Sequence, residues 1–226
     1  MASVRTLVTV GAAVVAAAAL AAPPASAAAT TIRKGSATAD AYSGNVQASL
    51  LGTAEVSTSL GGGSCNQSTM TGSTGSDGTN LNISAATFAN DPGPGCPGGG
   101  GTVTVSTENL PWSGGSAVFD GSHAGGRDAV ITIAGFRVKA VASILGGITC
   151  YYGGSLTADG FNPDNPGRTD TGVAEAQVSV KGATVQKQDG GNALCPATAT
   201  VTANYKLLGE KTAGSGTFDQ TLYITG

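Results

Sequence analysis

The sequence predicts an all-β protein with a β-sandwich or barrel-like architecture, made of two tandem homologous β units that carry one disulfide each. Three observations support this: segments in which apolar and polar side chains alternate, four cysteines, and short motifs that recur in the same order. The chain has 226 residues, of which 36 are glycine and only 11% are charged. Low charge and a glycine share about twice the usual one are typical of an exported β protein with many turns.

Several segments show the two-residue period of half-buried strands. Apolar residues fall mainly at alternate positions in 137–142, 174–181, 200–205 and 218–225. Clusters of Gly, Asn and Asp separate these runs, as expected for turns between strands. Beyond the first 27 residues no segment holds a 3.6-residue apolar period for three turns, so the chain favours a sandwich or barrel over a helical fold.

Residues 1–27 are predicted to be a Sec-type signal peptide. Arg5 supplies a positive n-region, an Ala- and Val-rich apolar run follows, and Ala25-Ser26-Ala27 fits the small-x-small cleavage rule. We therefore expect a secreted, extracellular protein. The alternative is a retained N-terminal anchor, but the apolar run is short and Ala-rich for a permanent membrane span.

The rest of the chain contains an internal repeat. Residues 60–65 match 145–150, Cys96-Pro97 matches Cys195-Pro196, and 115–120 match 214–219, in the same order. Three matches with shared spacing are hard to obtain by chance. We predict a first β repeat at 28–120 and a second at 121–226, or one compact domain over 28–226. The second copy carries 14 extra residues between its cysteines, and the turn-rich stretch 157–170 is their expected place.

An even number of cysteines in an exported chain indicates disulfides. Four cysteines allow three pairings, and the pairing that follows the repeat joins Cys65 to Cys96 and Cys150 to Cys195. A pairing between the two copies is the alternative. Zinc is the rival use of the cysteines, but C-x2-C and H-x3-H spacings are absent from the sequence.

The N-terminal segment, the two cysteine pairs and the element Asn109-Leu110-Pro111-Trp112-Ser113 together resemble a group of small secreted β proteins of actinobacteria. That group has no established activity. The resemblance implies export and β structure, and it implies nothing about chemistry.

No catalytic constellation is evident in the sequence. His123 is the only histidine, no G-x-S-x-G elbow is present, and the polar segment around it reads as the connector between the copies. A hydrolase that uses His123 and nearby acids is the third-ranked function. The glutamates Glu55, Glu108, Glu175 and Glu210 form no recognisable glycosidase pair. We expect no enzyme activity, no cofactor and no catalytic residue.

Two binding possibilities remain open. Trp112, Tyr151 and Tyr152, with Phe161, are candidates for a ligand site, because aromatic rings offer a flat face to sugars. The alternative is that they cover the core. Asp159, Asp164 and Asp170 with nearby Asn residues could hold Ca²⁺, although Pro163 and Pro166 favour a plain turn-rich loop, and we predict no metal site.

The net charge of −3 and the absence of basic clusters argue against nucleic acid and anionic membranes as partners. We also expect no membrane insertion of the mature chain. The leading hypothesis is a secreted non-enzymatic β protein, associated with the cell envelope or free. The runner-up is a carbohydrate- or small-ligand-binding module whose partner is a polysaccharide or a small ligand.

Overall fold

The computed structural model describes residues 29–93 and 95–226. The predicted signal peptide at 1–27 lies outside the described residues. The described chain is all-β, with two short 3-10 helices, η1 (Ala124–Gly126) and η2 (Ile144–Gly146). The strands are β1 (Thr31–Lys34), β2 (Gly44–Thr58), β3 (Gly61–Cys65), β4 (Gln67–Thr74), β5 (Leu81–Ala89), β6 (Cys96–Gly98), β7 (Gly101–Thr107), β8 (Trp112–Phe119), β9 (Ala129–Ala142), β10 (Ile148–Phe161), β11 (Ala176–Lys187), β12 (Thr198–Glu210) and β13 (Phe218–Thr225).

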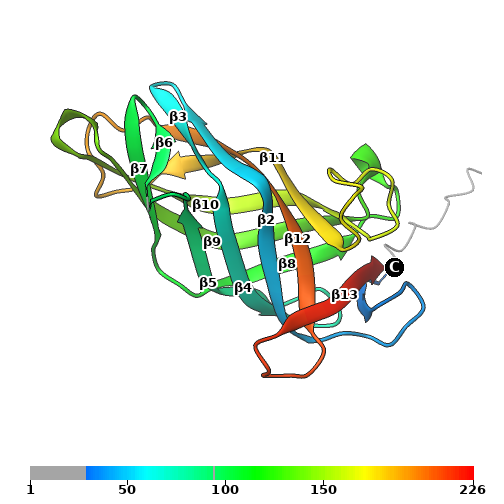
Figure 1. Cartoon of the computed structure of the whole chain (residues 1–226). Coiled ribbons are helices and arrows are strands. Elements are labelled where there is room, and N and C mark those ends of the chain that lie inside the picture. The colour runs from blue at the N-terminus through cyan, green and yellow to red at the C-terminus, as the bar shows by residue number, and fades with distance from the viewer. Residues whose placement is uncertain (1–28, 94) are drawn as a thin grey trace, which may run out of the picture.

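All strands belong to one antiparallel sheet, and eight of them close it into a ring (Figure 1). The order around the ring is β2, β4, β5, β8, β9, β10, β11 and β12, and pairing of β12 with β2 completes it. Closure of this kind leaves no free edge among the eight strands. The predicted all-β, barrel-like architecture is confirmed.

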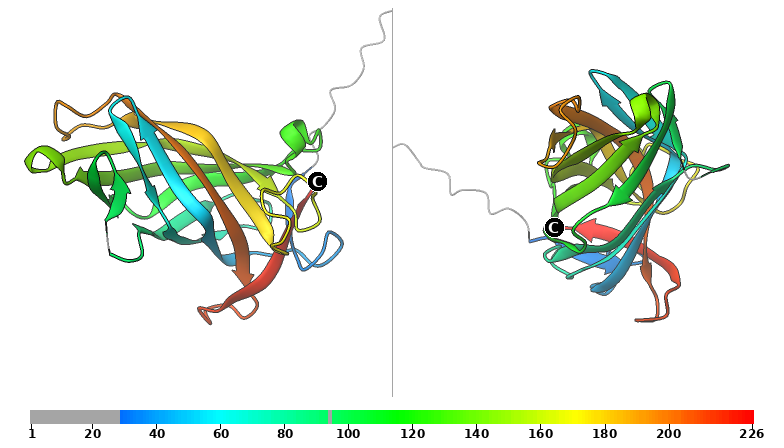
Figure 2. Two further views of the ribbon diagram at one scale, coloured as in Figure 1. Left: turned by 45° about the horizontal axis from the view of Figure 1, so that its top comes forward. Right: turned by 90° about the vertical axis from the view of Figure 1, so that its left-hand side faces the viewer.

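The remaining strands lie at the two ends of the ring. At one end β3, β6 and β7 connect β2 to β9 through their own ladders. At the other end β13 pairs with β12 and β1. Figure 1 shows β3, β6 and β7 far from β13 and the C-terminus, and Figure 2 adds a view from the end that holds these three strands.

Both disulfides form within the predicted units. Cys65 at the end of β3 is bonded to Cys96 at the start of β6, and Cys150 in β10 is bonded to Cys195 in the β11–β12 connection. Glycines permit the close approach of β3 and β6, because a Cβ on Gly98 would lie 2.5 Å from the Cα of Gly63. The glycine runs at 61–63 and 98–101 lie within β3 and across the turn from β6 to β7.

The two predicted units occupy consecutive halves of the ring, in the same strand order. The two units meet at two places in the sheet. At one, β7 and β8 of the first unit pair with β9 of the second, and at the other, β12 of the second unit pairs with β2 of the first. One part of the proposed alignment does not correspond, because Gly115 to Phe119 lie in β8 whereas Gly214 lies in the turn before β13. The duplication itself stays a prediction.

The prediction that residues 157–170 form an inserted loop is partly wrong. Its first five residues are strand, since β10 continues to Phe161 and pairs Asp159 with Ser179 and Phe161 with Gln177. The connection between β10 and β11 therefore starts at Asn162. It is also held by hydrogen bonds, because Asn165 donates to the Asp128 carboxylate at 2.8 Å and the amide of Gln177 bonds the Asp170 backbone in both directions.

Inward-facing residues of the ring form the main core. Ala203 and Tyr205 of β12 and Val178 and Val180 of β11 are buried, as their alternation predicts. The outer face of β11 departs from the prediction because Gln177 and Ser179 are also buried. The β10–β11 connection covers that face and hydrogen-bonds both side chains, and Ser179 also donates to the Asn204 side chain of β12.

Candidate functional site

Two apolar cavities lie inside the closed sheet. The larger has a volume of about 210 Å³ and lies toward the end of the sheet that carries the disulfides. The smaller has a volume of about 110 Å³ and lies toward β1 and β13. Four residues line both cavities and so separate them: Met70, Ile133, Val180 and Tyr205.

The larger cavity is lined almost entirely by hydrocarbon. None of its described lining residues is charged, and Thr58, Tyr152 and Tyr205 contribute the only side-chain hydroxyls. All three hydroxyls already have partners: Tyr152 donates to the Pro196 carbonyl at 3.2 Å, Tyr205 bonds the Ser68 hydroxyl at 3.1 Å, and Thr58 donates to the Gly61 carbonyl at 2.6 Å. The cavity therefore offers a ligand dispersion contacts and almost no free hydrogen-bonding group.

Exposed apolar side chains mark the opening of the larger cavity. Of the four large hydrophobic residues left exposed in the described chain, three line it: Val56 at 37%, Leu60 at 67% and Leu194 at 55%. The fourth, Val118, lies on β8 and lines neither cavity. Apolar exposure concentrated at one place marks a contact site for an apolar molecule.

The two disulfides hold the segments that surround this opening. Cys65, Cys96 and Cys150 line the larger cavity themselves, and Leu194 is next to Cys195. Lys187 adds a further tie, since its ammonium donates to the Asn192 carbonyl at 3.0 Å. A cross-linked rim keeps its shape in the absence of a ligand, which reduces the ordering cost of binding.

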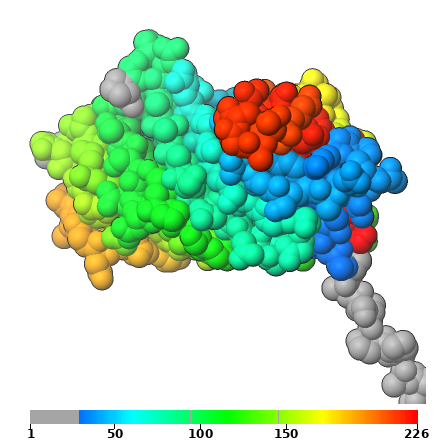
Figure 3. All heavy atoms as spheres, turned by 90° about the horizontal axis from the view of Figure 1, so that it is seen from below, coloured from blue at the N-terminus to red at the C-terminus, as the bar shows by residue number. Residues whose placement is uncertain are grey.

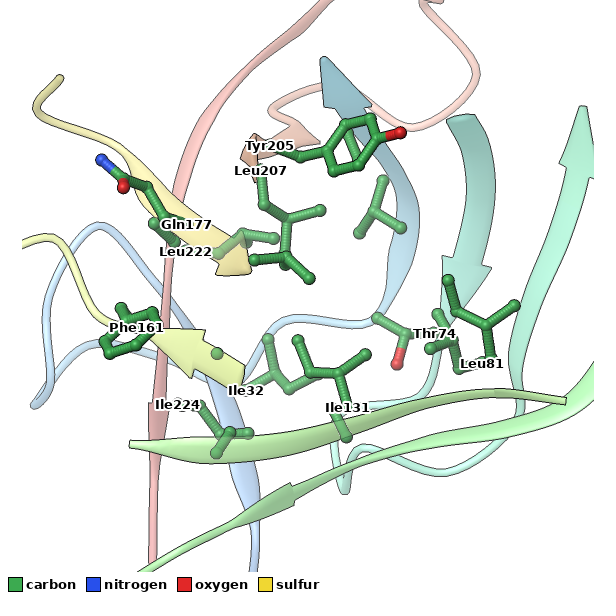
Figure 4. Close-up of a pocket in the computed structure, with 18 of the residues that line it drawn as sticks. Ile32, Thr74, Leu81, Ile131, Phe161, Gln177, Tyr205, Leu207, Leu222 and Ile224 are labelled. Carbon is green, nitrogen blue, oxygen red and sulfur yellow. The ribbon is translucent and has the colours of Figure 1, made fainter. Parts of the chain in front are cut away.

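The smaller cavity is covered by the terminal strands. Ile32 of β1 and Leu222 of β13 are buried against it, and Figure 4 shows Tyr205 on the opposite side from Ile224. Asn162 fastens this cover, because its side chain bonds both the carbonyl and the amide of Ile224. Figure 3 shows the red C-terminal hairpin beside the blue N-terminal segment at this end.

Tyr205 lies at the boundary between the two cavities and is 2% exposed. Burial raises the pKa of its phenol to about 12, and the hydrogen bond with Ser68 offsets only part of this effect. The hydroxyl is therefore neutral at physiological pH. The hydroxyl holds the aromatic side chain of Tyr205 in place, since its hydrogen bond with Ser68 joins β12 to β4.

The four aromatic residues proposed as a sugar face do not form one. Trp112, Tyr152 and Phe161 are buried, with 1%, 6% and 2% of their surface exposed. Tyr151 alone is partly exposed, and the Arg137 guanidinium lies 5.5 Å from its ring centroid. Tyr152 does line the larger cavity and Phe161 the smaller one, so two of the four belong to the cavity walls.

His123 lies in the connection between β8 and β9, next to η1. Its Nδ1 is 3.4 Å from a carboxylate oxygen of Asp128. The neighbouring Ser122 hydroxyl donates to Asp120 instead, and this bond lowers the pKa of the Asp120 carboxyl. Asp128 also accepts from the Asn162 amide and the Asn165 side chain, so it fastens this connection to the one between β10 and β11.

The acidic residues of the expected calcium loop have other partners. Asp159 forms ion pairs with Arg127 at 3.2 Å and Lys181 at 3.2 Å, and Asp170 accepts from the Gly172 amide. Across residues 29–93 and 95–226, no three His, Cys, Asp or Glu side chains gather in a way that could hold a metal ion. Within the same residues, no helix is long and apolar enough to cross a membrane.

Sequence reasoning missed the residues that define the cavities, above all Met70, Phe136 and Tyr205. The alternation in β12 did predict that Tyr205 points inward. It carried no information on whether the inside is filled, because packing density depends on side chains from strands far apart in the sequence.

No family model, no curated protein and no solved structure matches this chain.

Proposed function

We propose that this protein is a secreted, non-enzymatic binding protein that holds a small apolar molecule in the larger cavity. The observation that carries the proposal is the coincidence of an uncharged cavity with exposed Val56, Leu60 and Leu194 at its opening. Small-molecule sites are typically concave and mostly apolar, which agrees with this arrangement.

The volume sets the size of the ligand. An apolar cavity of ~150 Å³ can stay dry and bind benzene. The larger cavity has about 210 Å³, so it accommodates a ring system or a short hydrocarbon chain somewhat larger than benzene. A ligand that fills the cavity gains dispersion attraction with wall atoms that otherwise face empty space.

A carbohydrate ligand is a poorer match for this cavity. Each sugar hydroxyl would lose its water partners, at a cost of about 1–3 kcal/mol when no new hydrogen bond forms. The Tyr152 and Tyr205 hydroxyls are already bonded within the protein. The small-ligand form of the binding hypothesis is therefore better supported than the polysaccharide form.

Secretion is part of the proposal. The two disulfides indicate an oxidising, extracellular type of environment. The predicted Sec-type signal peptide at 1–27 agrees with that environment. Export would place the binding site outside the cell, so that the ligand is met there or carried there.

The binding test uses the disulfide-bonded protein recovered from a secreting host. Naphthalene, n-octanol and a soluble glucan are titrated by calorimetry at two temperatures. We expect saturable one-to-one binding of the two apolar probes, with the negative heat-capacity change that accompanies apolar burial, and no binding of the glucan.

A matched pair of variants locates the binding. Ala142, the last residue of β9, lines the larger cavity, whereas exposed Val118 lines neither cavity. Ala142→Trp should reduce naphthalene affinity at least tenfold, and Val118→Trp should leave it unchanged. Binding that survives Ala142→Trp, or binding of the glucan alone, would contradict the proposed function.

A further inference from the structure

We propose that Met70, Ile133, Val180 and Tyr205 form a partition that sets the longest unbranched hydrocarbon chain the protein can hold. This inference rests on the proposed function and names its ligand class: a single apolar chain with a polar head that stays at the rim. The four residues are the ones shared by the linings of the two cavities.

The position of the partition follows from the strands that carry it. Met70 is on β4, Ile133 on β9, Val180 on β11 and Tyr205 on β12. These strands lie around the ring rather than on one side of it. Their inward side chains therefore meet across the interior, and a chain that enters past Leu60 and Leu194 reaches them end-on.

The four residues differ in how firmly they are held. Tyr205 is fixed by its hydrogen bond with Ser68, and Ile133 and Val180 are β-branched side chains with few rotamers. Met70 is 8% exposed and unbranched, with three rotatable bonds. Met70 is therefore the movable part of the partition, and its size decides whether the smaller cavity can be reached.

The head group is placed by the chemistry of the lining. No described residue in the larger cavity is charged, so an ionised or strongly hydrated head must remain in water at the opening. Only the chain enters. If the partition were removed, the cavities of about 210 and 110 Å³ would join into a space that reaches the lower end of the usual range for ligand sites, about 300–1,000 Å³.

The test is a titration of the disulfide-bonded protein with primary n-alkanols of increasing length. For the unaltered protein we expect affinity to rise about fourfold for each added CH2 group, as expected from its burial, until the chain meets the partition. Beyond that length, affinity should level off or fall. We call the chain length at which affinity stops rising the break. In Met70→Ala the break should move to longer chains by two or more carbons.

Two control variants separate the partition from a general loosening of the core. Met70→Leu conserves volume and should keep the break where it is. Leu222→Ala enlarges only the smaller cavity and leaves the partition in place, so it should also keep the break. If Met70→Ala does not fold, Val180→Ala provides a second variant in which the partition is reduced, and it should move the break in the same direction.

The outcomes distinguish the two proposals. If a folded Met70→Ala or Val180→Ala protein binds alkanols with an unchanged break, the partition is overturned and the binding function stands. A break that moves equally in Leu222→Ala also overturns it. If the unaltered protein binds no alkanol of any length, the proposed function fails and the partition fails with it.

Discussion

The indole nitrogen of Trp112 donates a 2.9 Å hydrogen bond to the backbone carbonyl of Glu108. Trp112 is 1% exposed, and its ring packs against Phe136 with 4.9 Å between centroids. Phe136 in turn lines the larger cavity. The Leu-Pro-Trp element therefore anchors the start of β8 to the wall of the candidate site.

Truncation of this anchor should destabilise the protein strongly. We expect Trp112→Ala to lower the free energy of unfolding by about 3–5 kcal/mol, because it leaves a cavity in the core. Urea unfolding followed by circular dichroism measures the change. Val118→Ala, on the exposed outer face of β8, should stay within about 0.5 kcal/mol of the unaltered protein. Equal effects of the two substitutions would contradict the burial of Trp112.

Both disulfides should contribute similarly to stability. The bonded cysteines are separated by 31 and 45 residues, and loop entropy then gives roughly 3.5 to 4 kcal/mol for each bond. We expect Cys65→Ser/Cys96→Ser and Cys150→Ser/Cys195→Ser to lose about that much in urea unfolding. Non-reducing peptide mapping should recover Cys65 linked to Cys96, and recovery of Cys65 linked to Cys150 would overturn the connectivity.

Glu210 should make stability depend on acidity. Hydrogen bonds from the Gly214 and Gly216 amides and from Asn45 lower the pKa of its carboxyl. A carboxyl with a depressed folded-state pKa stabilises the fold above its unfolded value of about 4.3, and this stabilisation is lost as the pH falls through the folded-state value.

The corresponding variant is Glu210→Gln. Its melting temperature should be lower than that of the unaltered protein at pH 7, and the difference should shrink below pH 4 as Glu210 itself becomes protonated. Glu55→Gln, an exposed change on β2, serves as the control and should melt like the unaltered protein at every pH. A difference for Glu210→Gln that is constant from pH 7 to pH 3 would refute the linkage.

The β10–β11 connection provides a fourth test. Replacement of 163–174 by a short Gly-Ser turn removes the hydrogen bonds between Asp170 and Gln177 and the one from Asn165 to Asp128, but no strand residue. We expect a folded protein that is less stable by about 1–3 kcal/mol, from a few bonds worth about 0.5–1.5 kcal/mol each.

Replacement of 157–170 should have a much larger effect. This segment includes Asp159 and Phe161, which pair with β11 and close part of the ring. The sequence-based expectation of a loop throughout 157–170 is wrong for the residues up to Phe161, so their removal shortens β10. Circular dichroism and gel filtration should show loss of the native fold for this variant alone. Two variants of equal stability would mean that the end of β10 is dispensable.

Local pattern was enough to predict much of this protein. The alternation of apolar residues around Val178 and Tyr205 predicted strands and their inward faces, because side-chain direction in a strand reverses at every residue. Recurrence of the cysteine motifs predicted that Cys65 bonds Cys96 and that Cys150 bonds Cys195. The position of His123 in the connection between the two halves also followed from the polar, glycine-rich segment around it.

Tertiary structure decided what those strands enclose. Alternation indicates two faces but not what covers each of them, so the burial of Trp112, Gln177 and Phe161 could not be predicted from their own segments. Closure of the sheet depends on the pairing of β12 with β2, which lie near opposite ends of the chain. The cavities and the partition at Met70 and Tyr205 exist only once that pairing is made, because strands distant in sequence supply their walls.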